Sequence, residues 1–279
     1  MYTAVDFFAG MGGVSKGLEE AGFKVLKAYD LWEDALKTHK HNLPNIEVEC
    51  IDIKKLDTIN IPNADLYHFS PPCQSFSTSG KKEGINSLNG SLIYETVRIL
   101  KDKQPKIFTF ENVKGLVVGK NKDIFEELIS LYNNIGYVCT YKVINAYNFG
   151  VVQNRERLII VGIRKDLGFV FTFPDKVINN KKLFDIIGNI KNNKGIPTHG
   201  KELVKKLKYI PNGGSVKDIP EEIRPKSFPN SYKRLSWNEV PPTITRNYRV
   251  PSSANCIHPT ENRGLSDSEA LLIQGFDES

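Results

Sequence analysis

The chain has 279 residues, a formal net charge of +6 at pH 7 and four cysteines. That length supports one large core, or a large domain with a smaller one. Its apolar runs are strand-length and no basic-then-apolar leader precedes them, so we expect a cytoplasmic protein without a membrane span. The cysteines form no C-x-x-C pair, which argues against a zinc site or a disulfide framework, and we expect no metal.

The positive charge is concentrated in one part of the sequence. Residues 164–234 hold 16 Lys and Arg against 7 Asp and Glu, an excess of +9 that leaves −3 for the remainder. Such an asymmetry is typical of a lobe that holds a polyanion. A solvated lysine-rich surface gives the same pattern, so the charge alone leaves both interpretations open.

Short apolar strands alternate with amphipathic helices up to about residue 164. This alternation predicts an α/β fold with a doubly wound, mostly parallel sheet. Turn residues dominate afterwards and predict a smaller, loop-rich domain. The expected strands are 3–8, 23–29, 47–51, 64–69, 106–110, 137–144 and 158–163, and the expected helices are 14–21, 33–41, 91–103 and 122–134.

We therefore divide the chain into a first domain at 1–174, a small domain at 175–262, and a segment at 263–279 that returns to the first domain. Ser266, with Glu269 three residues later, predicts a capping box that opens a helix. That helix is expected to expose Leu271 or Phe276.

A glycine turn, Gly10-Met11-Gly12-Gly13, follows the first expected strand and precedes the first helix. This geometry lets backbone amides approach a ligand, although packing alone would also explain a lone turn. The spacing is not the G-x-G-x-x-G dinucleotide fingerprint, which argues against an NAD oxidoreductase. Asp30 ends the second strand, where an acid can bind ribose hydroxyls; a surface acid opening a helix is the alternative.

The most informative stretch is Ser70-Pro71-Pro72-Cys73-Gln74, directly after the strand expected at 64–69. Two prolines stiffen the backbone at a strand's carboxyl end, where open α/β sheets place their ligands. A single cysteine is often only a small buried hydrophobe. Here polar motifs accompany it, because Glu111-Asn112-Val113 ends a later strand and Gln153-Asn154-Arg155-Glu156-Arg157 precedes another.

Together these four motifs resemble the DNA (cytosine-5) methyltransferase family of the bacterial restriction–modification type, in the family's own motif order. The resemblance covers the whole chain except a lysine-rich stretch near 165–230. It implies the S-adenosylmethionine-dependent methyltransferase fold, S-adenosyl-L-methionine as cofactor, and duplex DNA as partner, with the protein associated with the nucleoid. The domain at 1–174 would then be catalytic and bind the cofactor, and that at 175–262 would recognise the target.

The resemblance also implies the cofactor residues. Phe8 and the glycines would face the methionine part, Asp30 the ribose, and Leu31 with Asp52 and Ile53 the adenine. Whether Leu31 or its neighbour Trp32 lies against the adenine stays open. The complete set is Phe8, Ala9, Gly10, Gly12, Gly13, Asp30, Leu31, Asp52, Ile53, Pro72 and Leu92.

The implied catalytic residues are Cys73, Glu111, Arg155 and Arg157. Carbon 5 of cytosine is a poor nucleophile, and a thiolate added at carbon 6 makes an enamine that can attack a methyl sulfonium. Cys73 is the expected nucleophile, and Glu111 donates a proton toward ring nitrogen 3. One arginine would donate to the exocyclic oxygen while the other orders Glu111 or a phosphate.

Each catalytic assignment has a structural alternative. Glu111 could be a helix-capping or salt-bridging acid, and the two arginines a structural ion-pair network. The target cytosine must rotate out of the duplex to be reached. Residues 75–89 are expected to close on it as a lid, with an ordinary surface loop as the competing interpretation.

The end of the sequence departs from the family pattern, because no Gln-x-Gly-Asn-x-Val segment follows Gln274-Gly275-Phe276. A second polypeptide, a truncated sequence or an impaired protein would explain this. Two functional alternatives also stay open, a tRNA cytosine-5 methyltransferase and an inactive or incomplete subunit. The segment 234–245 resembles the motif that organises the recognition lobe, but the recognised DNA sequence does not follow from it.

Overall fold

The computed structural model describes residues 1–72, 92–226 and 231–277. The chain divides into two compact units. The first unit comprises Met1–Val143 and Arg157–Pro174, and the second comprises Ile144–Glu156 and Asp175–Ser279. The domain boundaries expected at 174 and 262 stay predictions.

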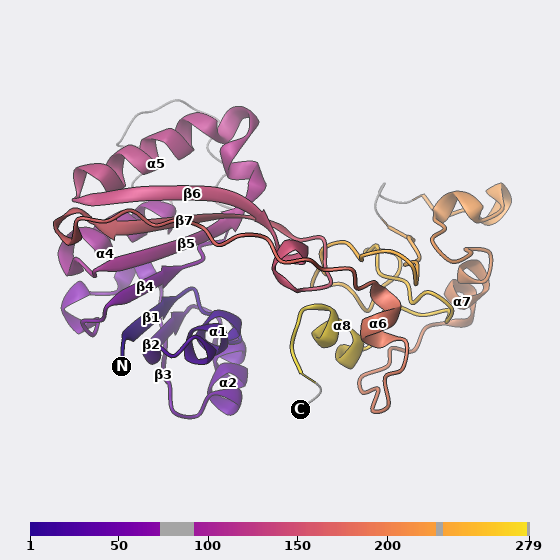
Figure 1. The fold of residues 1–279 in the computed structure, drawn as a ribbon. Helices are drawn as coiled ribbons and strands as arrows, with labels where there is room; N and C mark the ends of the chain where they lie inside the picture. Colours follow the sequence, from indigo (N-terminus) through magenta and orange to yellow (C-terminus); the bar gives the residue numbers. More distant parts are fainter. Residues whose placement is uncertain (73–91, 227–230, 278–279) are drawn as a thin grey trace. The chain divides into compact units, whose positions relative to one another are not determined.

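The first unit is built on a sheet whose described strands run in the order β3-β2-β1-β4-β5-β7-β6 (Figure 1). The pairs β2–β3, β1–β2, β1–β4 and β4–β5 are parallel, while β5 and β7 are antiparallel. The α/β class with a mostly parallel, doubly wound sheet is therefore confirmed. The strands are β1 (Thr3–Phe7), β2 (Lys24–Asp30), β3 (Glu47–Cys50), β4 (Leu66–Phe69), β5 (Ile107–Val113), β6 (Tyr137–Asn145) and β7 (Glu156–Arg164).

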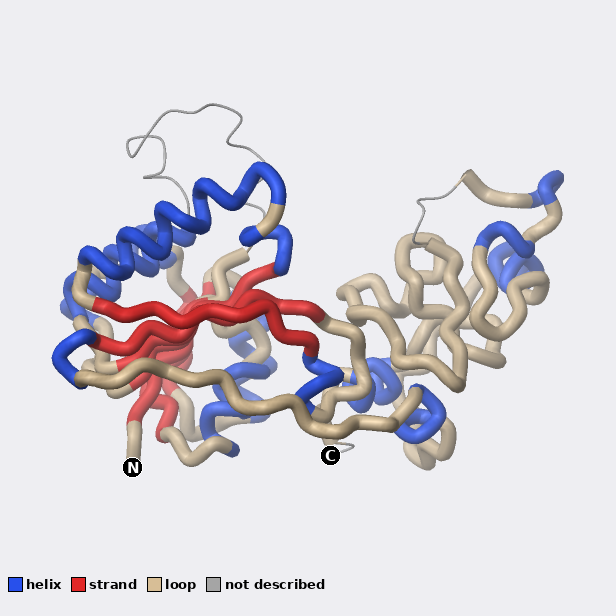
Figure 2. Tube along the Cα trace, turned by 45° about the horizontal axis from the view of Figure 1, so that its top comes forward, coloured by secondary structure: helices blue, strands red, loops and turns tan. Residues whose placement is uncertain are grey.

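Helices cover both faces of this sheet (Figures 1 and 2). Helices α1 (Gly13–Glu20) and α2 (Glu33–Asn42) lie on one face, and α4 (Leu92–Lys103) and α5 (Lys122–Asn134) lie on the other. Each helix begins and ends within one residue of its predicted range. The agreement follows from the strong helical periodicity of their apolar residues.

Alternation along the strands separates two cores. On β1 and β4, Phe7, Tyr67 and Phe69 belong to the large cluster that includes residues of α4 and α5. The Phe7 ring stacks on Phe69 with centroids 4.7 Å apart. On the other face, Ala4 and Leu66 belong to a smaller cluster. Because side chains of a strand alternate between faces, both layers bury their apolar residues without a continuous apolar sequence.

The described part of the second unit is mostly loops, with short 3-10 helices and the α-helices α6 (Leu183–Ile187), α7 (Lys201–Leu207) and α8 (Asp267–Ile273). Its main core is formed by α6 and α8 together with buried residues of the connecting loops. Loops of this kind bury many backbone carbonyls, and each of these needs a hydrogen-bond donor.

Arg234 supplies several of these donors. Its side chain is 3% exposed, and its guanidinium donates to the carbonyls of Leu207, Ile210 and His258 at 2.6–2.8 Å. It also donates to the side chain of Asn262 at 2.8 Å. Burial lowers the pKa of Arg234. The residue thus joins the end of α7 to the loop that precedes α8.

The predicted capping box at α8 is confirmed. The Ser266 hydroxyl accepts from the Glu269 amide at 3.1 Å, and the Glu269 carboxylate accepts from the Ser266 amide at 2.8 Å. Arg263 donates to both carboxylate oxygens of Glu269, at 2.8 and 2.7 Å. Leu271 is exposed, as expected. The helix packs on α6 within the second unit, and the expected return of 263–279 to the first domain stays a prediction.

Among the described residues, no helix combines the length and apolar character needed to cross a bilayer.

Gly162 on β7 tests the packing of the larger core. A Cβ atom at this position would lie 2.0 Å from Cε1 of the buried Phe108 ring. Because Phe108 is enclosed by Tyr132 and Tyr137, it has no room to retreat. We expect Gly162→Ala to lower the free energy of unfolding by about 1–3 kcal/mol, as overpacked cores do, measured by urea denaturation.

The matched control is Gly17→Ala in α1, where an added Cβ meets no atom within 4 Å. There the variant should gain roughly 0.5–1 kcal/mol, because alanine loses less conformational freedom in a helix. Equal stabilities of the two variants would contradict this description of the core.

Candidate functional site

The carboxyl ends of neighbouring parallel strands border a cavity of about 250 Å³ in the first unit. Its walls come from the residues that follow β1, β2, β3 and β4, and from the first residue of α4. Because these strands end at one edge of the sheet, residues far apart in sequence meet here. The lining consists of Phe8, Asp30, Leu31, Ile51, Asp52, Ile53, Ser70, Pro72 and Leu92.

Most of the predicted cofactor residues are among these, and two lining residues were missed. The missed residues are Ile51 and Ser70, which the sequence marks only as neighbours of predicted ones. Leu31 lines the cavity, whereas the neighbouring Trp32 is not among its lining residues. The structure brings together Phe8, Asp30, Leu31, Asp52, Ile53, Pro72 and Leu92.

The predicted residues of the glycine turn are not among the residues that line this cavity: Ala9, Gly10, Gly12 and Gly13. Gly12 has φ +93°, and a Cβ there would lie 2.9 Å from the ring of His39. This close approach gives a packing reason for the glycine. A role for the turn in cofactor binding stays a prediction.

Asp30 connects the turn to the cavity. One carboxylate oxygen accepts from the Gly10 amide at 2.8 Å, and the other accepts from the Trp32 amide at 2.8 Å. Both oxygens are thereby fixed at the cavity wall. Each carboxylate oxygen can accept a further hydrogen bond, so Asp30 still has capacity to bind a ligand hydroxyl.

Phe8 and Ser70 shape the wall between β1 and β4. Phe8 adopts φ +62°, which is strained for a residue other than glycine. The Ser70 hydroxyl donates to the Phe8 carbonyl at 3.2 Å, and the Ser70 amide donates to the Phe7 carbonyl at 3.3 Å. These bonds hold the turned backbone of Phe8 in place, which gives Ser70 a positioning role that its sequence context did not reveal.

Arg98 on α4 supports the opposite wall. It donates to the Ile53 carbonyl at 2.8 Å and pairs with Glu95, with 2.7 Å between Nε and Oε2. Asp52 caps the short 3-10 helix Ile53–Lys55 by accepting from the Lys54 amide at 3.0 Å. The wall formed by Asp52 and Ile53 is therefore held from two sides.

Asn112 holds the backbone just before Cys73. It is 2% exposed, and its amide nitrogen donates to the Pro71 carbonyl at 3.0 Å while its amide oxygen accepts from the Val113 amide at 2.9 Å. This side chain joins the end of β5 to the segment that follows β4. Cys73 itself, together with the predicted lid at 75–89, lies outside the described residues.

Glu111 and Arg157 meet on neighbouring strands. Arg157 Nε lies 2.8 Å from Glu111 Oε1, and the two side chains are 21% and 26% exposed. β5 extends to Val113 and β7 begins at Glu156, so both residues stand within strands. Arg155 precedes β7 and belongs to the second unit, where its amide donates to Asn145 Oδ1 at 3.2 Å.

A buried acid lies beneath the glycine turn. Asp6 on β1 is fully buried, and its Oδ2 accepts from the Ser15 hydroxyl of α1 at 2.6 Å. Burial raises the pKa of Asp6 to about 7, against the opposing effect of the Ser15 hydrogen bond. His68 is its partner on β4, and burial lowers the pKa of His68 to about 4. Both groups are therefore most stable uncharged inside the fold.

The cavity has the composition of a nucleoside site. Its walls are apolar at Leu31, Ile53 and Leu92, and carboxylates stand at Asp30 and Asp52. Such a combination can enclose a base while binding its hydroxyl or amino groups. Within the described part of the chain, no group of three or more His, Cys, Asp or Glu side chains is arranged to hold a metal ion.

Comparisons with known proteins agree with this geometry. The family model described as C-5 cytosine-specific DNA methylase matches residues 2–279. Type II methyltransferase M.FnuDI of Fusobacterium nucleatum is 40% identical over 68% of this chain and 56% of its own length. Type II methyltransferase M.Sau96I of Staphylococcus aureus is 31% identical over 99% of this chain and 68% of its own length.

The fold also resembles a solved structure. The S. pombe Dnmt2 methyltransferase aligns with a TM-score of 0.73 over 100% of this chain and 88% of its own, at 15% identity. At that identity the likeness concerns the fold alone. The chain spans between about half and two thirds of the length of the two relatives described above.

Asp6 is expected to make the free energy of unfolding depend on pH. An unfolded Asp ionises near pH 4, whereas folded Asp6 keeps its proton up to about pH 7. The folded state therefore binds more protons than the unfolded state in this window, and the free energy of unfolding falls as the pH rises. Between pH 4 and 7, the free energy of unfolding of wild type should fall by at most roughly 4 kcal/mol more than that of Asp6→Asn.

Urea denaturation of both proteins at several pH values measures this difference. His68 contributes a slope of opposite sign to both, because its lowered pKa costs stability as the pH falls, so it cancels in the comparison. Parallel pH curves for wild type and Asp6→Asn would show that Asp6 is ionised in the fold.

Proposed function

Because the chain belongs to the C-5 cytosine-specific DNA methylase family, we propose that it transfers a methyl group from S-adenosyl-L-methionine to carbon 5 of a flipped-out cytosine in a specific duplex DNA sequence. The observation that carries this proposal is the family match over residues 2–279. The hydrogen bond from Asn112 to the Pro71 carbonyl and the ion pair of Glu111 with Arg157, both in the first unit, support it. The restriction–modification setting comes from the Type II relatives.

The cavity at the sheet edge would hold the cofactor. Asp30 would bind the ribose hydroxyls through the remaining lone pairs of its fixed carboxylate, and Leu31 and Ile53 would enclose the adenine. Asp52 would accept from the adenine amino group. Bound S-adenosylmethionine supplies an electrophilic methyl group. The residues around it fix its orientation and exclude water, which is a large part of what a transferase site contributes.

Cys73 would begin the reaction. Its thiolate adds to carbon 6 of the cytosine, the ring's carbon 5–carbon 6 double bond opens, and Glu111 delivers a proton to ring nitrogen 3. The resulting enamine would attack the methyl group through carbon 5, and S-adenosylhomocysteine would leave with the electron pair of the broken sulfur–methyl bond. Return of the ring nitrogen 3 proton to Glu111 and loss of the carbon 5 proton to a base or water would then expel the Cys73 thiolate and restore the aromatic ring.

The two arginines would divide the remaining tasks. The ion pair at 2.8 Å supports Arg157 as the residue that orders Glu111. Arg155 would then donate to the exocyclic oxygen of the cytosine, where negative charge develops as the thiolate adds.

The recognition unit, residues 175–262 in this proposal, would bind duplex DNA through loops in the major groove. The lysine excess in this region supports a polyanionic partner. The predicted second polypeptide gains no support from the comparisons, so the proposal concerns this chain alone. A cytoplasmic, nucleoid-associated location stays a prediction.

Removing the thiol tests the proposed chemistry. We expect Cys73→Ser to abolish methyl transfer to DNA, because serine is far less nucleophilic toward carbon 6, while DNA binding in a mobility-shift assay stays near wild type. Methylation is measured with tritiated S-adenosylmethionine and by bisulfite sequencing of a plasmid from the expressing host.

Cys139→Ser is the matched control, since Cys139 is a half-buried thiol on β6 outside the cavity. It should methylate as wild type does. Near-normal methylation by Cys73→Ser would end the covalent mechanism. Transfer to tRNA in preference to duplex DNA, in a competition between the two, would replace the DNA substrate with the tRNA alternative.

Asn112 is predicted to position the Pro71-Pro72-Cys73 backbone. Asn112→Ala removes the donor to the Pro71 carbonyl, and a nucleophile displaced by about 1 Å loses roughly 100-fold in rate. We expect kcat to fall by that order while the KM for S-adenosylmethionine changes little, measured by steady-state methyl transfer.

Tyr137→Phe controls for the loss of a buried hydrogen bond. The Tyr137 hydroxyl donates to the Pro105 carbonyl at 2.7 Å, beyond the opposite end of β5. Its loss should lower stability and leave kcat unchanged. Equal effects of the two variants on kcat would reduce Asn112 to a general structural role.

A further inference from the structure

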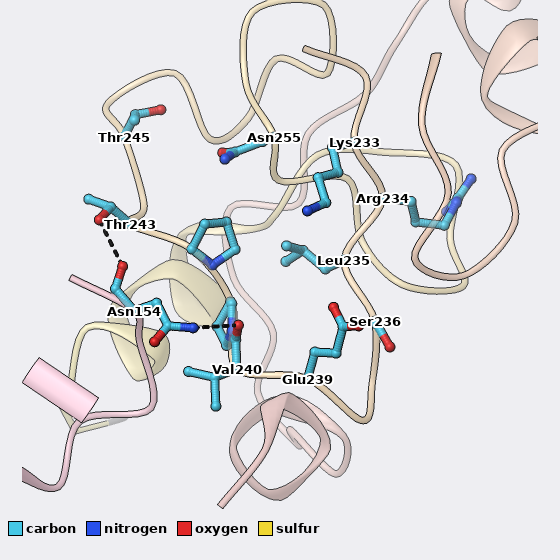
Figure 3. A pocket seen from close by; sticks show the side chains of 12 residues that line it. Asn154, Lys233, Arg234, Leu235, Ser236, Glu239, Val240, Thr243, Thr245 and Asn255 are labelled. Atoms are coloured by element: carbon cyan, nitrogen blue, oxygen red, sulfur yellow. Dashed lines mark hydrogen bonds between the residues drawn. The ribbon is translucent and has the colours of Figure 1, made fainter. Parts of the chain in front are cut away.

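A second cavity lies within the second unit, and none of its lining residues lines the cavity of the first unit. It measures about 540 Å³, and its residues surround an open hollow in Figure 3. Two prolines, Pro241 and Pro242, and the side chains of Leu235 and Val240 form its apolar surface. The other lining residues are polar: Asn154, Lys233, Arg234, Ser236, Glu239, Thr243, Thr245 and Asn255.

Some of these polar side chains are committed to the fold. Arg234 is saturated by the carbonyls that it joins. The Thr243 hydroxyl donates to the Asn154 carbonyl at 3.0 Å, and the Asn154 amide group donates to the Val240 carbonyl at 3.3 Å. These bonds, drawn as dashed lines in Figure 3, make the wall rigid.

Two charged side chains are uncommitted. Lys233 and Glu239 are both exposed, and neither side chain makes an ion pair or hydrogen bond with another described residue. In the view of Figure 3 they lie on opposite sides of Leu235. Asn255 and Thr245 add an amide and a hydroxyl at the rim. The cavity thus offers a cationic donor and an anionic acceptor among lining residues that are mostly polar.

A cationic donor beside an anionic acceptor favours a base edge over a phosphate as the part of a nucleic acid that binds here. A phosphate would need several donors and would be repelled by Glu239. The edge of a base pair presents acceptors and donors side by side, which Lys233 and Glu239 complement. In the major groove, guanine offers O6 and N7 to a lysine, and cytosine offers its N4 amino group to a glutamate.

The cavity is also attached to the catalytic segment. Asn154 forms a bridge with Pro242, and its amide donates to the Pro241 carbonyl at 2.8 Å. Asn154 directly precedes Arg155, which is expected to bind the target cytosine. A ligand in the cavity therefore contacts the same short segment that carries a catalytic side chain.

We infer that this cavity reads one guanine–cytosine base pair of the recognition sequence, with Lys233 donating to the guanine and Glu239 accepting from the cytosine. The inference rests on the proposed function, because it assigns part of the DNA sequence that the methyltransferase selects. Lys233 and Glu239 are specificity residues in this assignment, and they take no part in methyl transfer.

A binding selection tests the inference without requiring methyl transfer. Wild type, Lys233→Ala, Glu239→Ala and Lys233→Arg are each incubated with a pool of random duplexes, and the bound DNA is sequenced. Wild type should select a defined sequence, and each alanine variant should lose about tenfold to hundredfold of its preference for guanine–cytosine at one shared position. Lys233→Arg should keep it, because arginine binds the same guanine atoms.

The control is Lys201→Ala, which removes an exposed lysine of α7 outside the cavity. It should leave every position of the selected sequence unchanged. Circular dichroism shows whether each variant is folded, and Lys233→Gln or Glu239→Gln repeats the test if the corresponding alanine variant is not. Replacing the guanine at the shared position with 7-deazaguanine removes the N7 acceptor. This replacement should weaken DNA binding by wild type more than DNA binding by Lys233→Ala.

Several outcomes would overturn the inference. One is a selected sequence that Lys233→Ala and Glu239→Ala share with wild type at every position. Another is uniformly weaker binding to all sequences, which would indicate a phosphate contact. A wild-type chain that selects no sequence also overturns it. The plasmid methylation assay decides the proposed function separately in each case.

Discussion

The hydrogen bond from Asn112 to the Pro71 carbonyl links the two strand ends on which the proposed chemistry depends. Its donor is buried at the end of β5, and its acceptor lies in the segment after β4 that leads to Cys73. The preceding residue, Glu111, is paired with Arg157 on β7. The end of β5 therefore bonds to the segment after β4 through Asn112 and carries the proposed proton donor, Glu111, at the preceding position. The two side chains point in different directions because side chains on a strand alternate between its faces.

The cavity at the sheet edge depends on similar side chains, which hydrogen-bond to backbone groups. Asp30 binds two amides, Ser70 holds the strained Phe8, and Arg98 holds Ile53. These bonds order the walls before any ligand enters, so binding need not supply that ordering free energy. In the second unit, the loops bury backbone carbonyls that are not hydrogen-bonded within a sheet. Arg234 satisfies several of them at once, and Arg263 neutralises Glu269 beside α8.

Much of the first unit could be predicted because its strands and helices have strong apolar periodicity, and motifs at strand ends meet wherever parallel strands share an edge. That logic brought Asp30, Asp52 and Pro72 to one cavity. It could not reveal Ser70 or Arg98, whose roles are hydrogen bonds to carbonyls across the fold. The second unit was predicted only as loop-rich, because aperiodic loops carry no signal for long-range partners such as those of Arg234. For the same reason, the cavity of the second unit, with Lys233 and Glu239, could not be predicted.

The central claim is a transient bond between the Cys73 sulfur and carbon 6 of cytosine. A duplex in which 5-fluorocytosine replaces the target base tests it most directly, because fluorine at carbon 5 cannot leave as the proton does. With S-adenosylmethionine present, the account predicts a denaturation-resistant protein–DNA complex whose mass spectrum locates the linkage at Cys73. A protein that methylates the unmodified duplex but never forms this complex, or forms it through another residue, would contradict the account.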